Sequence, residues 1–460
     1  MKKLLVFAIS ILLAVVLLAG CNGNNNTPPA TDTSGPSSDN GSAPVTSDTP
    51  ADVELTFWFY PMWEGAEAVV GAEFADLVKQ EYPWITLNYE VLSYDAGPEK
   101  FTVAMATGAT PDIYNDGFSR IAPAVDAGLA VDITDVAQAI APCLTSDITH
   151  AGMVDGRNYA VNVSSYNGYV MLVNTTMARE LGVYDMLPAD RIHWSYDDFL
   201  DICREAKKAG KYGIPLYAGS RSSDSWYYSW LLSAGTPITK DDLSAMDVQG
   251  PEAELVLETL KTVVDEGLCP PGAATNKDED VLGFFSSGQS LFSFQGFNMQ
   301  VDFQNQMDNG EIDPFEMMMV AIPTPDGKAD PKTVTWGAES LVIFKNNNDE
   351  AKIDAAKKVV ELFYTNPAIA KQISENYQQT DIKGAEATFD NPALAEGNMW
   401  IVDFTNTYGT AAFGIMEPWW SDFRETFYVE LQGVFTGALT PEQALENWTA
   451  SGNAVIAAAQ

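Results

Sequence analysis

The feature that most restricts the fold is a strand–helix–strand pattern that begins at Val53. Apolar and polar residues alternate over 53–59 and again over 85–91, which is the period-two signature of β-strands. Between these segments, apolar residues recur at helical spacing from Ala66 to Val78. Such β-α-β units build parallel sheets with helices on both faces. The pattern therefore predicts an α/β fold.

Similar patterns predict further helices and strands along the chain. Thr440-Pro-Glu-Gln predicts a helix start, because Thr caps the helix, Pro fits its first turn and Gln reaches back to the cap. Other helices are predicted over Phe101–Thr107, Tyr196–Lys208, Trp226–Leu232, Glu252–Val264 and Lys352–Tyr364, and short strands over Pro111–Tyr114 and Ser290–Gln295. The sequence has no internal repeat of ~20–50 residues, which argues against solenoids and propellers.

The N-terminus carries a targeting pattern. Lys2 and Lys3 precede an apolar run of about 16 residues, shorter than the ~20 that span a bilayer. A basic start, a short apolar core and small residues before a cut site predict a secretory signal peptide over residues 1–20. Leu18-Ala19-Gly20-Cys21 resembles a bacterial lipobox, which implies cleavage before Cys21 and lipidation of its sulfur. An ordinary signal peptide and a single-span anchor are the alternatives.

The residues after Cys21 differ in composition from the rest of the chain. Residues 22–50 are rich in Asn, Ser, Thr, Pro and Asp and contain few large apolar side chains. Such a segment cannot bury enough surface to offset its chain entropy, so residues 21–50 are predicted to form a lipidated, disordered linker. The remaining ~400 residues suggest two domains.

The charge balance narrows the possible partners. The chain has 63 acidic and 25 basic residues and a formal net charge of −38. Phosphate backbones repel such a chain, so nucleic acid is excluded as a partner. Solubility outside the cell is one explanation of the charge, and a cationic ligand is the other.

The cysteines give no sign of a metal site. Cys203 lies on the apolar side of a predicted helix, which favours a buried thiol. Cys143 and Cys269 lie beside prolines and can pair, but sequence alone cannot establish a disulfide. The spacings suit no zinc site, and no metal or other cofactor is expected.

Catalytic motifs are not evident. The two histidines, His150 and His193, are far apart in the sequence and form no HExxH motif and no convincing Ser/His/Asp set. His193 precedes a helix, where a surface position is expected. The sequence has no P-loop and no Gly-x-Ser-x-Gly motif. A glycosidase needs only two carboxylates, but 63 acids make any such pair unspecific. The chain is therefore predicted not to be an enzyme.

Six segments, read together in order, resemble the family 1 extracellular solute-binding proteins of bacterial ABC sugar importers. They are Phe101–Tyr114 with its Thr-Gly and Pro-Asp-Ile, Asp155–Asn174, His193–Phe199, Phe284–Leu291, Ala351–Thr365 and Thr436–Ala444. Two positions depart from the family pattern: Asn162 lies near the usual proline, and Val173 stands at the usual tyrosine.

The resemblance implies a two-lobed periplasmic-binding-protein-like type II fold with a ligand cleft between the lobes. The N-terminal lobe would hold residues 53–164 plus 333–383, and the C-terminal lobe 165–332 plus 384–460. The implied function is a monomeric, extracytoplasmic receptor that delivers a carbohydrate, most simply an oligosaccharide, to the transmembrane subunits of an ABC permease. Its only membrane contact would be the lipid on Cys21.

Candidate ligand residues follow from strand ends and aromatic clusters. Ligands of open α/β sheets bind beyond the carboxyl ends of strands. Sugars also favour aromatic rings for their C–H faces and fixed polar groups for their hydroxyls. The predicted ligand residues are Tyr60, Trp63, Asp116, Arg120, Tyr166, Asn167, Trp226, Tyr227, Phe297, Asn298, Trp336, Glu339, Trp420 and Arg424.

Core packing is the alternative role for these rings. Trp226 and Tyr227 point to different sides of a helix, so at least one is expected to face the ligand. Replacing Trp226 or Trp420 with alanine is expected to weaken binding by ~1–3 kcal/mol while leaving the fold intact.

Three other functions remain open. The same scaffold can bind a polyamine or peptide, because carboxylates in the cleft can bind an amine. A secreted carbohydrate-active enzyme and an adhesive surface lipoprotein are the others. Acidic and phosphorylated ligands are disfavoured, because few Arg and Lys occur at the candidate positions.

Overall fold

The computed structural model describes residues 51–94, 96–145, 152–164, 168–335, 339–377, 380–411, 414, 417 and 419–459. The chain divides into Met1–Thr49 and Pro50–Gln460, and every element below belongs to the second unit. The predicted signal peptide, the linker and Cys21 lie outside the described residues. So do His150, Tyr166, Asn167 and Trp336.

The first sheet has the strand order β2-β1-β3-β11-β6. β1 (Val53–Phe59) pairs in parallel with β2 (Ile85–Val91) and with β3 (Ile113–Gly117). The predicted β-α-β unit is confirmed. The sheet is mixed rather than parallel throughout, however, because β11 (Glu339–Ile343) returns from a distant part of the chain and runs antiparallel to β3 and to β6 (Ala160–Asn162).

The connection between β1 and β2 is more complex than its sequence pattern. A π-helix, η1 (Glu67–Glu73), leads directly into α1 (Phe74–Glu81). The apolar spacing correctly predicted the buried face but not the wider hydrogen-bond pattern. Gly71 lies against the ring of Tyr89, and a Cβ at this position would lie 2.7 Å from that ring.

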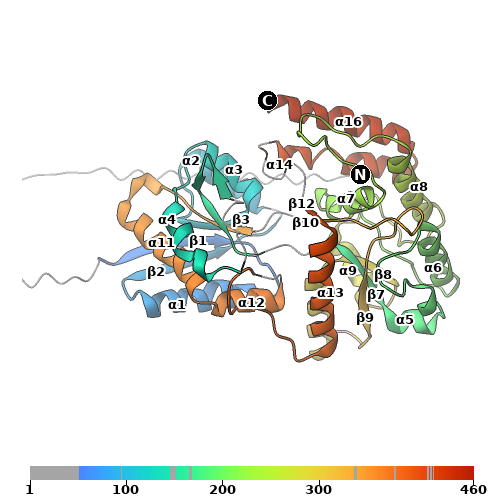
Figure 1. The fold of residues 1–460 in the computed structure, drawn as a ribbon, viewed down its shortest axis with the longest axis horizontal. Helices are drawn as coiled ribbons and strands as arrows, with labels where there is room; N and C mark the ends of the chain where they lie inside the picture. Colours follow the sequence, from blue (N-terminus) through green and yellow to red (C-terminus); the bar gives the residue numbers. More distant parts are fainter. Residues whose placement is uncertain are drawn as a thin grey trace, which may run out of the picture. The chain divides into compact units, whose positions relative to one another are not determined.

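Helices cover both faces of the first sheet (Figure 1). Besides η1 and α1, they are α2 (Gly97–Thr107), α3 (Phe118–Asp126), α4 (Thr134–Ile140), α11 (Glu350–Thr365) and α12 (Ala368–Asn376). Alternate side chains of β3 and β11 enter two separate cores. Ile113 and Leu341 face the core that contains α11, whereas Tyr114 and Val342 face the core that contains α2 and α3. Gly108 directly follows α2 and caps its C-terminus, and its φ of 70° suits a residue without Cβ.

The second sheet is antiparallel and has the order β8-β7-β9. Its strands are β7 (Val170–Asn174), β8 (Phe292–Gln295) and β9 (Met317–Val320). The helices around it are α5 (Thr175–Glu180), α6 (Tyr196–Lys208), α7 (Asp224–Ser233), α8 (Pro251–Asp265), α9 (Asp278–Ser286), α10 (Phe297–Asp308), α13 (Pro392–Tyr408), α14 (Trp420–Phe423), α15 (Tyr428–Thr436) and α16 (Pro441–Ala458). Thr440 and Gln443 form the predicted capping box of α16.

Short elements complete the described chain. They are the pairs β4 (Met153–Val154) with β5 (Arg157–Asn158) and β10 (Thr333–Thr335) with β12 (Gly409–Ala411), and the 3-10 helices η2 (Ala141–Cys143), η4 (Tyr184–Met186), η5 (Arg221–Ser223) and η6 (Asn346–Asn348). The cores of the first sheet use residues within 53–163 and 341–385, and those of the second use residues within 170–334 and 394–456. Each sheet therefore has its own hydrophobic cores.

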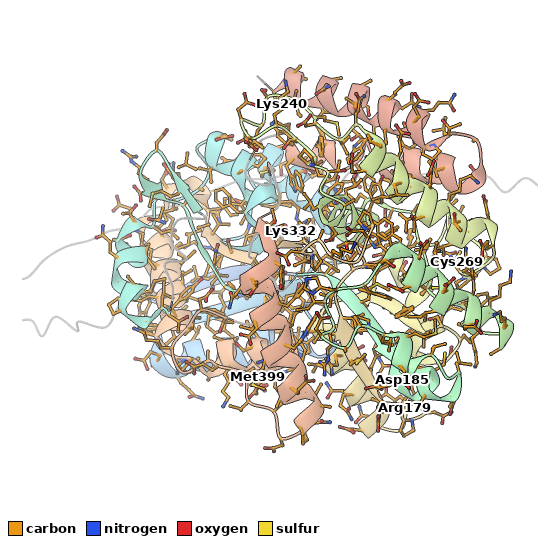
Figure 2. The ribbon with its side chains drawn as sticks, turned by 45° about the vertical axis from the view of Figure 1, so that its right-hand side comes forward. Arg179, Asp185, Lys240, Cys269, Lys332 and Met399 are labelled. Atoms are coloured by element: carbon orange, nitrogen blue, oxygen red, sulfur yellow. The ribbon has the colours of Figure 1, made fainter. Side chains whose placement is uncertain are left out.

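The three cysteines in the described part of the chain are free. Cys203 is fully buried, as predicted, and Cys269, labelled in Figure 2, is also buried. The Cys143–Cys269 disulfide that the sequence left open is thus not formed. None of the helices in the described ranges is both long and apolar enough to cross a bilayer.

Candidate functional site

The carboxyl end of β3 carries a buried polar network. The Tyr114 hydroxyl donates to Asp116 Oδ2 at 2.5 Å, and the Tyr60 hydroxyl lies 3.3 Å from the Tyr114 hydroxyl. Arg120 Nε lies 2.7 Å from both carboxylate oxygens of Asp116. The geometry follows from the sequence, because α3 starts directly after β3 and places Arg120 one turn beyond Asp116.

Burial sets the protonation states in this network. Burial first, and then the Asp116 charge, raise the pKa of Tyr60 to about 12, and the same causes raise the pKa of Tyr114 further. Both phenols therefore keep their protons at neutral pH and act as hydrogen-bond donors. The Arg120 guanidinium also lies 5.5 Å from the centroid of the Tyr60 ring, within cation–π range.

Glu339 lies at the start of β11, opposite Gly117 in the β3 register, and is only 4 % exposed. Burial first, and then the Asp116 charge, raise the pKa of Glu339 to about 8, although Arg120 and a hydrogen bond with Tyr377 act the other way. Within the described chain, Glu339 Oε2 has no hydrogen-bond partner. With a pKa of about 8, the Glu339 carboxyl group is mostly protonated at pH 7 and can donate as well as accept a hydrogen bond.

A second set of polar side chains lies around the start of α7. Asp224 is fully buried, and Arg424 binds it through Nε and Nη2, with an Nη2–Oδ1 distance of 2.9 Å. Arg424 directly follows α14, which is anchored by the buried rings of Trp420 and Phe423. Arg221 lies in η5, which comes directly before α7, and its Nη1 donates to Glu425 Oε1 at 3.2 Å.

The two sets of polar side chains lie close enough for the charges of one set to shift pKa values in the other. The charge of Arg221 lowers the pKa of Tyr60, and the charge of Arg120 lowers the pKa values of both Arg221 and Arg424. α3 and α14 are also in contact. We call this set the charged cluster: Tyr60, Asp116, Arg120, Arg221, Asp224 and Arg424. It combines side chains from elements around the first sheet with side chains from elements around the second.

The structure groups part of the predicted ligand set. Tyr60, Asp116, Arg120 and Arg424 belong to the charged cluster, and Glu339 is coupled to it through Asp116 and Arg120. The sequence analysis missed Arg221, Asp224 and Tyr114. Arg221 and Asp224 immediately precede the aromatic run at Trp226, and they were overlooked because only the rings were considered there.

Most of the predicted aromatic residues are buried in cores. Trp226, Tyr227 and Trp420 are 0 %, 2 % and 1 % exposed and stack on Phe294, Phe427 and Phe423, respectively. The prediction assumed that one side of α7 packs into the core and another side faces the ligand. In the structure, α7 carries buried rings on several sides. The burial contradicts the expectation that Trp226→Ala and Trp420→Ala leave the fold intact. A role of these rings in ligand contact stays a prediction.

The other predicted residues in the described ranges are not part of the charged cluster. Trp63 is partly buried against the core of the first sheet. Phe297 is buried at the start of α10, with its ring centroid 5.4 Å from that of Phe389, and the adjacent Asn298 is half-buried. His193 is partly exposed, as predicted, with its ring nitrogens 2.7 Å from Asp190 Oδ2 and 3.3 Å from Asp330 Oδ1.

The described residues contain no group of three or more His, Cys, Asp or Glu side chains placed to hold a metal ion. The charged cluster instead offers oriented hydrogen-bond donors and acceptors. This arrangement suits a polar organic molecule.

Comparison with known proteins places the chain in a family. The profile of bacterial extracellular solute-binding proteins matches residues 73–380, more than half of the chain. A candidate binding protein of Brucella abortus (strain 2308) is 23 % identical over 381 residues, which cover 82 % of this chain and 87 % of that protein.

Two solved structures show a similar fold. An ABC substrate-binding protein of Listeria monocytogenes, in complex with cycloalternan, has a TM-score of 0.71 and 18 % identity and covers 88 % of this chain and 99 % of its own. The cyclic alpha-maltosyl-1,6-maltose binding protein of Arthrobacter globiformis has a TM-score of 0.67 and 20 % identity, with the same coverage of 88 % and 99 %. The chain therefore has their two-lobed α/β fold and belongs to the family of bacterial extracellular solute-binding proteins.

Proposed function

We propose that this chain is a lipid-anchored extracytoplasmic receptor that binds an oligosaccharide and delivers it to an ABC permease without changing it chemically. The observation that carries the proposal is the charged cluster, which joins polar side chains from the surroundings of both sheets. Residues 53–164 plus 333–383 would form one lobe, and residues 165–332 plus 384–460 the other. The ligand would lie between them.

The chemistry of the cluster favours a sugar. The side chains of Arg120, Arg221 and Arg424 are 26 %, 27 % and 17 % exposed, so they are the donors that a solute can reach. The buried carboxylates of Asp116 and Asp224 fix the orientation of Arg120 and Arg424. A saccharide hydroxyl can accept hydrogen bonds from donors oriented in this way. A buried polar group left without a partner costs ~1–3 kcal/mol, so such a site discriminates between hydroxyl patterns. The saccharides bound by the Listeria and Arthrobacter proteins support this assignment.

The mechanism is a shift in population. A solute that contacts both groups of side chains at once binds more tightly to the closed arrangement of the lobes, and it favours closure by that difference in contact energy. Moving from ~1 % to ~99 % closed requires about 5.5 kcal/mol, which a few hydrogen bonds can supply. A polyamine is a weaker candidate, because three arginines would face its positive charges.

Isothermal titration calorimetry with a panel of oligosaccharides tests the proposal. We expect saturable heat with at least one glycan and a smaller radius of gyration by small-angle scattering when that glycan is bound. Heat from peptides or polyamines but from no glycan would contradict the choice of ligand. Glycan cleavage by the purified protein would contradict the absence of catalysis.

The anchor gives a separate prediction. Replacing Cys21 with alanine removes the sulfur that would carry the lipid, so nearly all of the protein should leave the membrane fraction and lose labelling by radioactive palmitate. Cys143→Ala is the matched control and should stay membrane-bound and labelled. A Cys21→Ala protein that remains in the membrane would favour the single-span anchor instead.

A further inference from the structure

The charged cluster contains three arginine side chains that come from three distant segments and influence one another electrostatically. Arg120 lies on α3, Arg221 in η5 and Arg424 directly after α14. Their side chains are 26 %, 27 % and 17 % exposed, so a solute can reach all three. Their like charges repel one another, and the pKa of Arg221 is lowered by both of the others.

The three charges are not equally compensated. Arg120 and Arg424 each bind a carboxylate that is almost fully buried, Asp116 or Asp224. Among the residues that the structure describes, the ion pair of Arg221 is with Glu425, whose side chain is 50 % exposed, and an exposed pair of this kind is weak. Asp224 attracts Arg221 as well, but its carboxylate is bound by Arg424. Burial first, and then repulsion from Arg424, lower the pKa of Arg221 despite the attraction of Glu425. Arg221 is therefore the least compensated cation of the cluster.

Arg221 also presents an unused pair of donors. Its contact with Glu425 uses Nη1, and among the residues the structure describes no hydrogen bond involves its Nε or Nη2. Nε and Nη2 form one edge of the planar guanidinium, and two parallel N–H groups on such an edge match the two oxygens of a carboxylate. Arg424 uses this same edge to bind Asp224.

We propose that the solute is an acidic saccharide, with a carboxylate of the uronic-acid type, and that the Nε–Nη2 edge of Arg221 binds this carboxylate. The inference rests on the proposed function and specifies its ligand class. It reverses the expectation from the sequence that acidic ligands are disfavoured. That expectation considered only the basic residues at the predicted ligand positions, and Arg221 is not one of those positions.

Glu425 competes with the ligand for Arg221 in this arrangement. Its carboxylate lies next to the binding edge and repels an incoming anion, whereas a neutral sugar is unaffected by its charge. Removing the Glu425 charge should therefore strengthen binding of an acidic saccharide, and removing the Arg221 charge should weaken it. The two neighbouring substitutions thus have opposite predicted effects.

A glycan array with neutral, uronic-acid, sulfated and phosphorylated saccharides, followed by calorimetry on the bound glycans, tests the inference. We expect uronic-acid glycans to bind. Arg221→Gln should weaken their binding about ten- to hundredfold, the size expected for losing a charge-assisted hydrogen bond. Glu425→Gln should strengthen it. Arg204→Gln is the control, because Arg204 pairs with Glu266 and Asp201 on the outside of α6 and should leave affinity unchanged.

The outcomes separate this inference from the proposed function. Binding of neutral glycans alone would overturn the acidic ligand but leave the saccharide receptor standing. Preference for sulfated or phosphorylated glycans, or an Arg221→Gln protein with unchanged affinity for uronic-acid glycans, would overturn the carboxylate assignment. Binding of no glycan of any class would overturn the proposed function itself.

Discussion

Replacing Trp226 with alanine is expected to lower the free energy of unfolding by about 3–5 kcal/mol, the usual cost of truncating a buried aromatic side chain. The Trp226 ring is fully buried, and its centroid lies 4.9 Å from that of Phe294, with the two planes 7° apart. Because the surrounding core relaxes only in part, the substitution leaves a cavity. Urea unfolding, followed by circular dichroism, measures the change.

Trp84→Ala provides the matched control, because Trp84 is only partly buried at the edge of the core of the first sheet. Its loss should destabilise the protein clearly less than the loss of Trp226. Equal stability of Trp226→Ala and the unmodified protein, together with weakened solute binding, would show that Trp226 is a ligand residue rather than a core residue.

Replacing Glu339 with glutamine is expected to stabilise the protein progressively as the pH rises from about 5 to 8. The folded state raises the pKa of Glu339 from 4.5 to about 8, so between these values the folded state binds more protons than the unfolded state. Stability linked to this group is therefore fully present below pH ~4.5 and declines until pH ~8. A rise in the pKa from 4.5 to about 8 corresponds to a loss on the order of 5 kcal/mol, which glutamine avoids because it stays neutral.

The measurement is the free energy of unfolding of both proteins across this pH range. The difference between them should grow with pH and level off above pH ~8. Glu258→Gln serves as the matched control, because it removes a carboxyl group that is exposed on α8 rather than buried. A flat difference for Glu339→Gln would mean that Glu339 is ionised in the folded protein at neutral pH.

Local patterns in the sequence were sufficient for the regular elements. The alternation over 53–59 and the capping residues of α16 depend on near neighbours in the chain, and the structure confirms both. The antiparallel insertion of β11 between β3 and β6 depends instead on pairing between residues more than 170 positions apart. No local pattern encodes such a pairing, so the sheet was expected to be parallel.

The candidate site likewise combines local contacts, which the sequence predicts, with long-range contacts, which it does not. Asp116 and Arg120 lie one helical turn apart, and their proximity follows from the chain direction after β3. The meeting of Arg120, Arg221 and Arg424 depends on how separate elements pack. The aromatic residues were misjudged for a related reason: Trp and Tyr have both an apolar body and a polar edge, so the same cluster suits a core or a sugar site. Only the burial of each ring in the folded protein distinguishes a core residue from a residue that contacts a sugar.

Native mass spectrometry of the purified protein, after incubation with the oligosaccharides that it binds, tests the central claim most directly. The account predicts a non-covalent complex of one protein with one saccharide, and the saccharide released from it should have an unchanged mass. Absence of any complex, or release of saccharides of lower mass, would contradict the claim that this chain binds a solute without cleaving it.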